Sequence, residues 1–234
     1  AESELTFLGL IVFENKLKPG SAPAIATLRH ANIGCKMVTG DNPRTAVSVA
    51  RECGILGQST NVFLASFVRG SPEQPTDAQL AWTSTDDERV HLNPDTLKPR
   101  DLDPLATEMG DLRVLDYELV VTGDVFRWMM DYAPIDLVRR MLIKGTIFAR
   151  MSPDEKHDLV DRLQELGYTV AMCGDGANDC GALKAADIGI SLSEAEASVA
   201  APFTSTRPDI SCVIEVIKEG RAALVTSFSC FKYM

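Results

Sequence analysis

The stretch Met172-Cys-Gly-Asp-Gly-Ala-Asn-Asp179 joins two segments of different character. The residues that lead into it, from Tyr168 to Cys173, form an apolar run that is typical of a buried parallel strand. The residues that follow, from Cys180 to Ala186, have the pattern of a short helix. In open α/β sheets, ligands bind at the carboxyl ends of strands, where such a strand turns into a helix. The stretch therefore predicts an α/β fold with a ligand site at this turn.

The turn carries two carboxylates, Asp175 and Asp179, which we expect to meet in a pocket at the sheet edge. Mg²⁺ commonly takes one or two carboxylates together with phosphate oxygens and water. We therefore predict that Asp175 and Asp179 bind Mg²⁺. The alternative is a polar turn in which Asp179 caps the helix that follows.

Composition limits the class of protein. The chain has 234 residues with 45% hydrophobic and 24% charged residues, which is ordinary for a globular protein with a substantial core. The net charge of −10 without a basic cluster argues against nucleic-acid binding. The six cysteines form no C-x-x-C pair and indicate reduced thiols. No apolar run reaches the roughly 18 residues of a membrane span.

Strand and helix patterns alternate along most of the chain, which predicts a Rossmann-like parallel sheet with helices on both faces. Strands are predicted at 5–13, 33–38, 118–122, 146–149, 168–173 and 188–192. Helices are predicted at 23–31, 43–53, 135–143, 153–166, 180–186 and 210–219, with one more after Asp124 as its cap. Residues 58–118 differ, because they are rich in Pro and Asp and their apolar residues show no period. We interpret them as a partly ordered insertion.

The tripeptide Thr-Gly-Asp occurs twice after a predicted strand. Thr39-Gly40-Asp41 precedes Asn42 and Pro43, which suit the cap and the first residue of a helix. A hydroxyl and backbone N–H groups at a helix N-terminus are a natural phosphate cradle. Thr122-Gly123-Asp124 has no such phosphate motif beside it, and we interpret it as a coincidental match.

A helix start at Ser152 carries a lysine in an unusual place. Ser152, Pro153 and Glu155 form the pattern of a capping box. Lys156 lies in the first turn, where a cation opposes the helix dipole. Lys156 either contacts an anion or is a solvated surface residue. Phosphoryl transfer needs Mg²⁺ and positive charge around the transferred group, which Thr39, Lys156 and the two aspartates could together provide. The sequence offers no evident nucleophile.

Three motifs in this order resemble the haloacid-dehalogenase-like phosphorylation domain of P-type ATPases. They are Thr39-Gly40-Asp41, then Ala149-Arg150-x-x-Pro153-x-x-Lys156, then Gly174-Asp175-Gly176-x-Asn178-Asp179 with Leu183-Lys184 and Asp187-Ile-Gly-Ile190. Further stretches are similar to the fifth subfamily, and within it to the lysosomal and endosomal polyamine transporters rather than the endoplasmic-reticulum helix dislocase. They are Phe7-Leu-Gly9, Asn15-x-Leu17-Lys18-Pro19, Cys173-Gly-Asp-Gly-Ala-Asn-Asp-Cys-Gly-Ala-Leu183, Ala201-Pro-Phe-Thr-Ser205 and Phe231-Lys-Tyr-Met234.

The resemblance implies roles for individual residues. Thr39 would orient the phosphoryl group, and Lys156 would neutralise its charge. Gly40, Asp41 and Arg150 would lie beside the bound ATP. Asp175 would bind Mg²⁺, while Asn178 and Asp179 would support that site and the phosphoryl group.

The family's phosphorylated aspartate lies in an Asp-Lys-Thr-Gly-Thr stretch, and this sequence contains no Asp-Lys pair. The resemblance therefore implies the C-terminal part of a phosphorylation domain, at 1–57 and 119–220, without its first strand and its nucleophile. Residues 58–118 would be an insertion, and 221–234 a stalk leading to a transmembrane helix. The complete protein would be an ATP-driven cation or polyamine transporter of the late endosome or lysosome membrane, with this part on the cytosolic face and inactive alone. A stand-alone phosphatase of the same superfamily, or a nucleotide- or partner-binding module without a nucleophile, are the alternatives.

Overall fold

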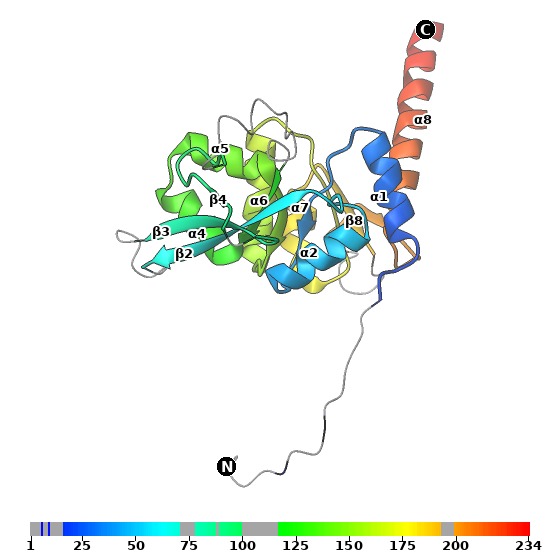
Figure 1. Ribbon diagram of the computed structural model, residues 1–234. Coiled ribbons are helices and arrows are strands. Elements are labelled where there is room, and N and C mark those ends of the chain that lie inside the picture. The colour runs from blue at the N-terminus through cyan, green and yellow to red at the C-terminus, as the bar shows by residue number, and fades with distance from the viewer. Residues whose placement is uncertain are drawn as a thin grey trace, which may run out of the picture.

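The computed structural model describes residues 6, 9, 16–70, 78–87, 89–99, 117–192 and 199–234. The strand expected at 5–13 falls almost entirely outside these residues. The described chain forms an α/β fold with two sheets and seven α-helices (Figure 1). This confirms the fold class predicted from the sequence.

The main sheet has six strands and the second sheet has three. In spatial order, the main sheet contains β1 (Met37–Val38), β6 (Gly145–Ala149), β5 (Tyr117–Thr122), β2 (Asn61–Arg69), β3 (Gln79–Ser84) and β4 (His91–Leu92). The second sheet contains β7 (Ala171–Gly174), β8 (Ile188–Ser191) and β9 (Phe203–Thr204). The strands β1, β6, β5 and β2 are parallel to one another, β3 and β4 are antiparallel to their neighbours, and the second sheet is wholly parallel.

Helices cover the main sheet on both faces because its central strands are apolar on both sides. The helices are α1 (Ser21–His30), α2 (Pro43–Glu52), α4 (Gly123–Tyr132), α5 (Ile135–Lys144), α6 (Pro153–Glu165), α7 (Cys180–Ala185) and α8 (Cys212–Tyr233). Along β5, Val120 packs with α2, whereas Leu119 and Val121 pack with α4, α5 and α6. This alternation is the period of a strand buried on both faces.

Part of the segment 58–118 extends the main sheet. Residues 61–64 of β2 pair in parallel with residues 117–120 of β5, and β3 then pairs antiparallel with β2. Arg51 of α2 forms a bidentate ion pair with Asp86, with N–O distances of 3.1 and 2.6 Å. This pair connects the turn after β3 to α2. The sequence pattern did not predict these strands.

Lys36 connects the start of β1 to the end of α5. Its Nζ donates to the carbonyls of Leu142 at 3.0 Å and Ile143 at 3.2 Å, and also to that of Gly145. These are carbonyls at the helix C-terminus that have no partner within the helix. Burial lowers the pKa of Lys36 to about 8, while the charge of Glu118 acts in the opposite direction.

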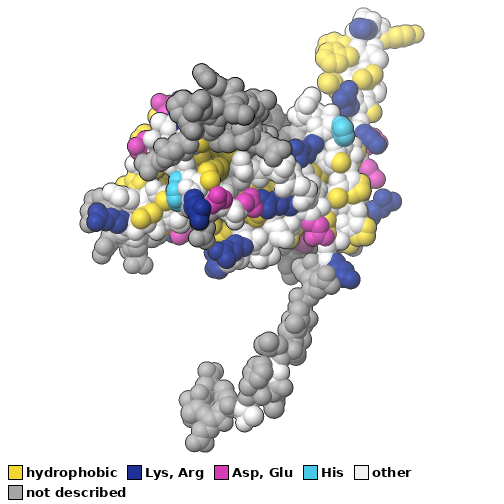
Figure 2. Space-filling view, viewed as in Figure 1, with side chains coloured by type: hydrophobic (Ala, Val, Ile, Leu, Met, Phe, Trp, Pro, Cys, Tyr) yellow, Lys and Arg dark blue, Asp and Glu magenta, His cyan; other side chains and the backbone are white. Residues whose placement is uncertain are grey.

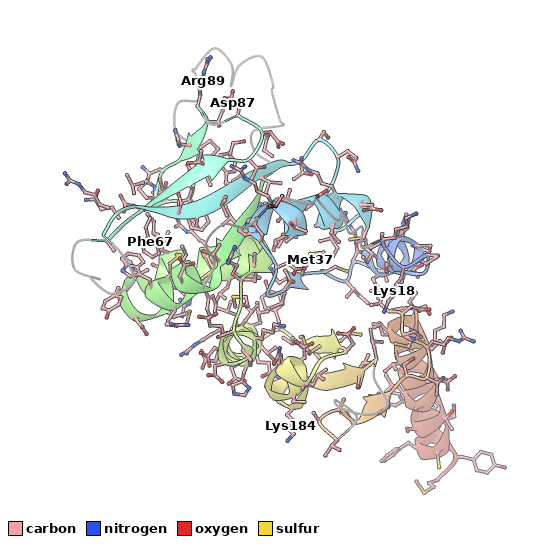
Figure 3. All side chains as sticks on the ribbon, turned by 90° about the horizontal axis from the view of Figure 1, so that it is seen from below. Lys18, Met37, Phe67, Asp87, Arg89 and Lys184 are labelled. Carbon is pink, nitrogen blue, oxygen red and sulfur yellow. The ribbon has the colours of Figure 1, made fainter. Side chains whose placement is uncertain are left out.

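The last helix is longer than the sequence pattern predicted. The expected helix at 210–219 is α8, which continues through Gly220 to Tyr233. Its second half projects from the body of the protein (Figure 1), and Figure 2 shows hydrophobic side chains along it. In the described ranges, no helix combines the length and the apolar character needed to cross a membrane. Where α1 meets α8, Lys18 donates to the carbonyl of Pro208 (Figure 3).

Candidate functional site

Three of the predicted site residues directly follow a strand at its carboxyl end. Thr39 follows β1, Arg150 follows β6, and Asp175 follows β7. Because β1 and β6 are parallel neighbours, Thr39 and Arg150 lie at the same edge of the main sheet. Asp175 lies at the corresponding edge of the second sheet.

The turn of Thr39, Gly40 and Asp41 is held between its own hydroxyl and the chain after β6. The hydroxyl of Thr39 accepts from the Asp41 N–H at 3.0 Å. The N–H groups of Arg150 and Met151 donate to the carbonyls of Asp41 and Thr39, each at 3.0 Å. Gly40 is exposed, and a Cβ built on it would meet no atom within 4 Å. The turn is therefore fixed in shape and open to solvent.

The helix after this turn begins as the sequence predicted. Asn42 is the N-cap, and its side-chain oxygen accepts from the Arg44 N–H at 2.9 Å. Pro43 is the first residue of α2. The open turn and the helix N-terminus together leave space for an anion beside backbone N–H groups.

Arg150 combines an exposed side chain with an unusual backbone conformation. Its φ of 51° lies in the left-handed region, which is uncommon for residues other than glycine. This conformation lets the Arg150 N–H reach Asp41 while the chain turns from β6 towards α6. Strained residues of this kind often occur at functional sites, because the surrounding structure must hold them in place.

Lys156 and Asp179 form an ion pair across the two parts of the site. The Nζ of Lys156 donates to Oδ1 of Asp179 at 2.7 Å, and their side chains are only 11% and 13% exposed. Lys156 is therefore not a solvated surface residue, and its contact is with Asp179 of the protein itself. Its contact with a phosphoryl group stays a prediction. Asp179 occupies the N-cap position of α7 but makes no side-chain capping bond, so the capping alternative is wrong.

The loop after β7 has features that suit a hard cation. A Cβ on Gly174 would lie 2.6 Å from Oδ2 of Asp179, so only glycine lets this carboxylate fold back over the strand end. Asp175 and Asn178 are exposed beside it, and residues 177–179 form a short 3-10 helix. Among the described residues, no group of three or more His, Cys, Asp or Glu side chains gathers as a metal cluster. A bound Mg²⁺ would thus take its remaining ligands from water or phosphate.

The neighbouring Cys173 is not a candidate nucleophile. Burial raises the pKa of its thiol to about 12, with Cys212 and the carboxylates of Asp175 and Asp179 adding to the shift. The thiolate is the reactive form of cysteine, and this environment disfavours it.

The second Thr-Gly-Asp turn has a packing role. Gly123 is buried, and a Cβ on it would overlap Oε2 of Glu155 and lie 2.6 Å from the Arg150 carbonyl oxygen. Thr122 is the N-cap position of α4, so the expectation that Asp124 caps this helix is wrong; Asp124 lies in the first turn. The sequence did not predict the contact of Gly123 with Glu155. The only signal for this contact was a glycine at the first position of a helix.

Comparison with known proteins gives matches over the whole chain. The chain is 51% identical over 240 residues to the vacuolar cation-transporting ATPase YPK9 of Saccharomyces cerevisiae. It is 44% identical over 235 residues to the human polyamine-transporting ATPase 13A3, and 48% identical over 234 residues to the mouse polyamine-transporting ATPase 13A2. Each match covers 100% of this chain but only 16% of the yeast protein and 19% of the other two. No family model matches the chain. The chain is thus homologous to a segment of P5-type ATPases.

Proposed function

We propose that this chain, as a homologue of a P5-type ATPase segment, is the part of a phosphorylation domain that binds Mg²⁺ and stabilises the transferred phosphoryl group. The observation that carries the proposal is the ion pair of Lys156 with Asp179, which connects the helix after β6 to the loop after β7. A cation and a carboxylate held together at the ends of two strands suit a site for a charged phosphoryl group and its metal.

Each predicted residue then has a role that fits its position. Thr39 orients the phosphoryl group from the open turn after β1, and Lys156 neutralises its charge. Asp175 holds Mg²⁺, which supplies charge neutralisation when bound, and Asn178 and Asp179 support that position. Gly40, Asp41 and Arg150 lie on the exposed side of the turn, where they would contact ATP.

The phosphorylated aspartate would come from outside this sequence. Within the described part of the chain, β1 pairs only with β6 and β7 only with β8, so each has a free edge. Both strands lead into site residues, Thr39 and Asp175. A strand that carries the Asp-Lys-Thr-Gly-Thr motif and pairs with these edges would place its aspartate between Thr39 and Asp175.

The complete protein would couple ATP hydrolysis to transport of a cation, and specifically a polyamine, through an aspartyl-phosphate. Two of the relatives are named for polyamine transport, and the identity extends over the whole chain. The second half of α8, at 221–234, would form a stalk towards a membrane helix. The membrane would be that of the late endosome or lysosome, with this domain on its cytosolic side.

Calorimetry of Mg²⁺ and beryllium fluoride binding tests this proposal, because beryllium fluoride imitates a phosphoryl group. Mg²⁺-dependent binding should be lost in Asp175→Ala and retained in Asp124→Ala, which removes a carboxylate from the first turn of α4 and serves as the control. If the chain alone does not bind, a peptide with the Asp-Lys-Thr-Gly-Thr motif should restore binding. Binding that is equal in both variants, or absent even with the peptide, would contradict the proposal.

A further inference from the structure

Glu155 is a buried carboxylate that the proposed chemistry does not use. It is 4% exposed and lies in the first turn of α6, next to Lys156 in the sequence. Its Oε2 accepts from the Ser152 N–H at 2.8 Å, and its own N–H donates to the Ser152 hydroxyl at 3.3 Å. Burial of a charge is costly unless the charge is paired, so the partner of Glu155 determines whether this first turn is stable.

The partner of Glu155 is Arg127 of α4. The Nη2 of Arg127 donates to Oε1 of Glu155, so the two oxygens of the carboxylate have separate partners. The Arg127 side chain is itself 64% exposed, so the pair has one solvated and one buried member. This contact connects α4, which follows the second Thr-Gly-Asp turn, to the start of α6.

Gly123 provides the space in which Glu155 lies. Any side chain at this position would overlap Oε2 of Glu155 and crowd the carbonyl of Arg150. The first turns of α4 and α6 therefore pack closely against each other. This close packing is possible because Gly123 has no Cβ.

The same first turn of α6 carries Lys156. The Lys156 N–H donates to the Ser152 carbonyl at 3.0 Å, so its backbone belongs to the turn that Glu155 closes. One residue after Glu155, the Lys156 side chain extends to Asp179. The position of the ammonium group thus depends on a turn that is held from α4.

We propose that Gly123, Arg127 and Glu155 form a positioning network that holds Lys156 against Asp179. Its importance for phosphoryl transfer rests on the function proposed above, whereas the positioning itself does not. Removing Arg127 leaves the buried charge of Glu155 without its partner, which favours opening of the first turn of α6. Lys156 then loses its fixed direction towards Asp179.

Trace labelling of lysine amines with an activated ester, followed by peptide mass spectrometry, tests the network in the 234-residue chain. Lys184, which is exposed on α7 (Figure 3), is the reference for full labelling. Lys36, whose amine is buried against α5, reports on opening of the whole fold. In Arg127→Ala, labelling of Lys156 should rise about threefold or more relative to Lys184, while that of Lys36 stays the same, because only a local pair is broken.

Three further variants test this result. Arg162→Ala removes an exposed ion pair with Glu165 near the other end of α6, at 2.8 Å, and should leave Lys156 labelling unchanged. Arg127→Lys keeps the charge beside Glu155 and should restore slow labelling. Gly123→Ala should act like Arg127→Ala where it folds. The network is overturned if Arg127→Ala labels Lys156 no faster than Arg162→Ala, or if Lys36 labelling rises in parallel.

Phosphorylation of the complete transporter separates this inference from the proposed function. Arg127→Ala should slow phosphoenzyme formation without changing the ATP concentration at half-maximal rate, because Arg127 is not among the residues proposed to contact ATP. A change in Lys156 labelling with an unchanged phosphorylation rate would support the network and contradict the role proposed for Lys156.

Discussion

The two Thr-Gly-Asp turns have the same three residues and lie at the same sheet edge, on either side of β6, yet they differ in surroundings. In the first turn, Gly40 is exposed and its Cβ position is empty. In the second turn, Gly123 is buried and its Cβ position is taken by Glu155. Position in the sheet is therefore not sufficient for a ligand site. What matters is whether a neighbouring side chain already occupies the space above the turn.

The segment that follows β6, from Arg150 to Glu155, causes the difference between the open and the filled turn, because it contacts both turns. On one side, Arg150 and Met151 donate backbone N–H groups to the first turn and leave its outer surface open. On the other side, Glu155 covers the second turn and bonds to Arg127. One turn thus stays available to a ligand, while the other holds the helix that carries Lys156.

The largest expected effect on stability comes from adding one methyl group to the glycine of each Thr-Gly-Asp turn. Gly123→Ala should lower the free energy of unfolding by about 3 kcal/mol, because the overlap with Glu155 outweighs the better helix propensity of alanine. Gly40→Ala should change it by less than about 0.5 kcal/mol, as expected for a surface site. Urea denaturation of both variants measures the difference. Equal effects would contradict the contrast between a filled and an open turn.

A smaller effect on stability is expected from substitutions at the N-cap positions of α2 and α4, the helices that follow the two turns. Asn42→Ala removes a capping bond of 2.9 Å and should cost about 1 kcal/mol of stability. Thr122 makes no side-chain capping bond, so Thr122→Ala should cost less. The same denaturation assay applies to both. A larger loss in Thr122→Ala than in Asn42→Ala would show that the second turn has a cap that the contacts do not reveal.

A separate, pH-dependent effect concerns Lys36, which precedes β1 and the first turn. The pKa of Lys36 is about 8 in the folded protein, against the ordinary lysine value of 10.5 that applies to the unfolded chain. Between these values the unfolded chain binds more protons, so this group makes stability rise as pH rises from 8 to 10.5. Lys36→Met should remove that rise, measured as the difference between the two proteins across this range. An identical pH dependence would contradict the shifted pKa.

The local parts of the fold were predictable from the sequence because their signals are local. The capping box at Ser152 and the cap at Asn42 depend on residues within one turn of chain, and both are as predicted. The strands β2 and β3 were not predicted, because β2 is fixed by pairing with β5, more than fifty residues away in the sequence. The division into two sheets depends on long-range pairing in the same way.

For the candidate site, the sequence motifs propose residues but say nothing of the contacts between them. The motifs identified Thr39, Lys156 and Asp179, and the structure adds the pairing of the last two. The network of Gly123, Arg127 and Glu155 was missed because a buried glutamate at a helix start looks the same in sequence as an exposed one. Only the approach of α4 to α6 distinguishes the two cases.

The proposed function requires this chain to bind Mg²⁺ and to supply positive charge for an aspartyl-phosphate whose aspartate lies elsewhere. The most direct measurement is the incorporation of labelled phosphate from Mg-ATP into a hydroxylamine-sensitive bond, with and without a segment that carries Asp-Lys-Thr-Gly-Thr. We predict incorporation into the added segment only, and its loss in Lys156→Ala and Asp175→Ala. Hydrolysis of Mg-ATP by the chain alone that disappears in Asp175→Ala would contradict the account.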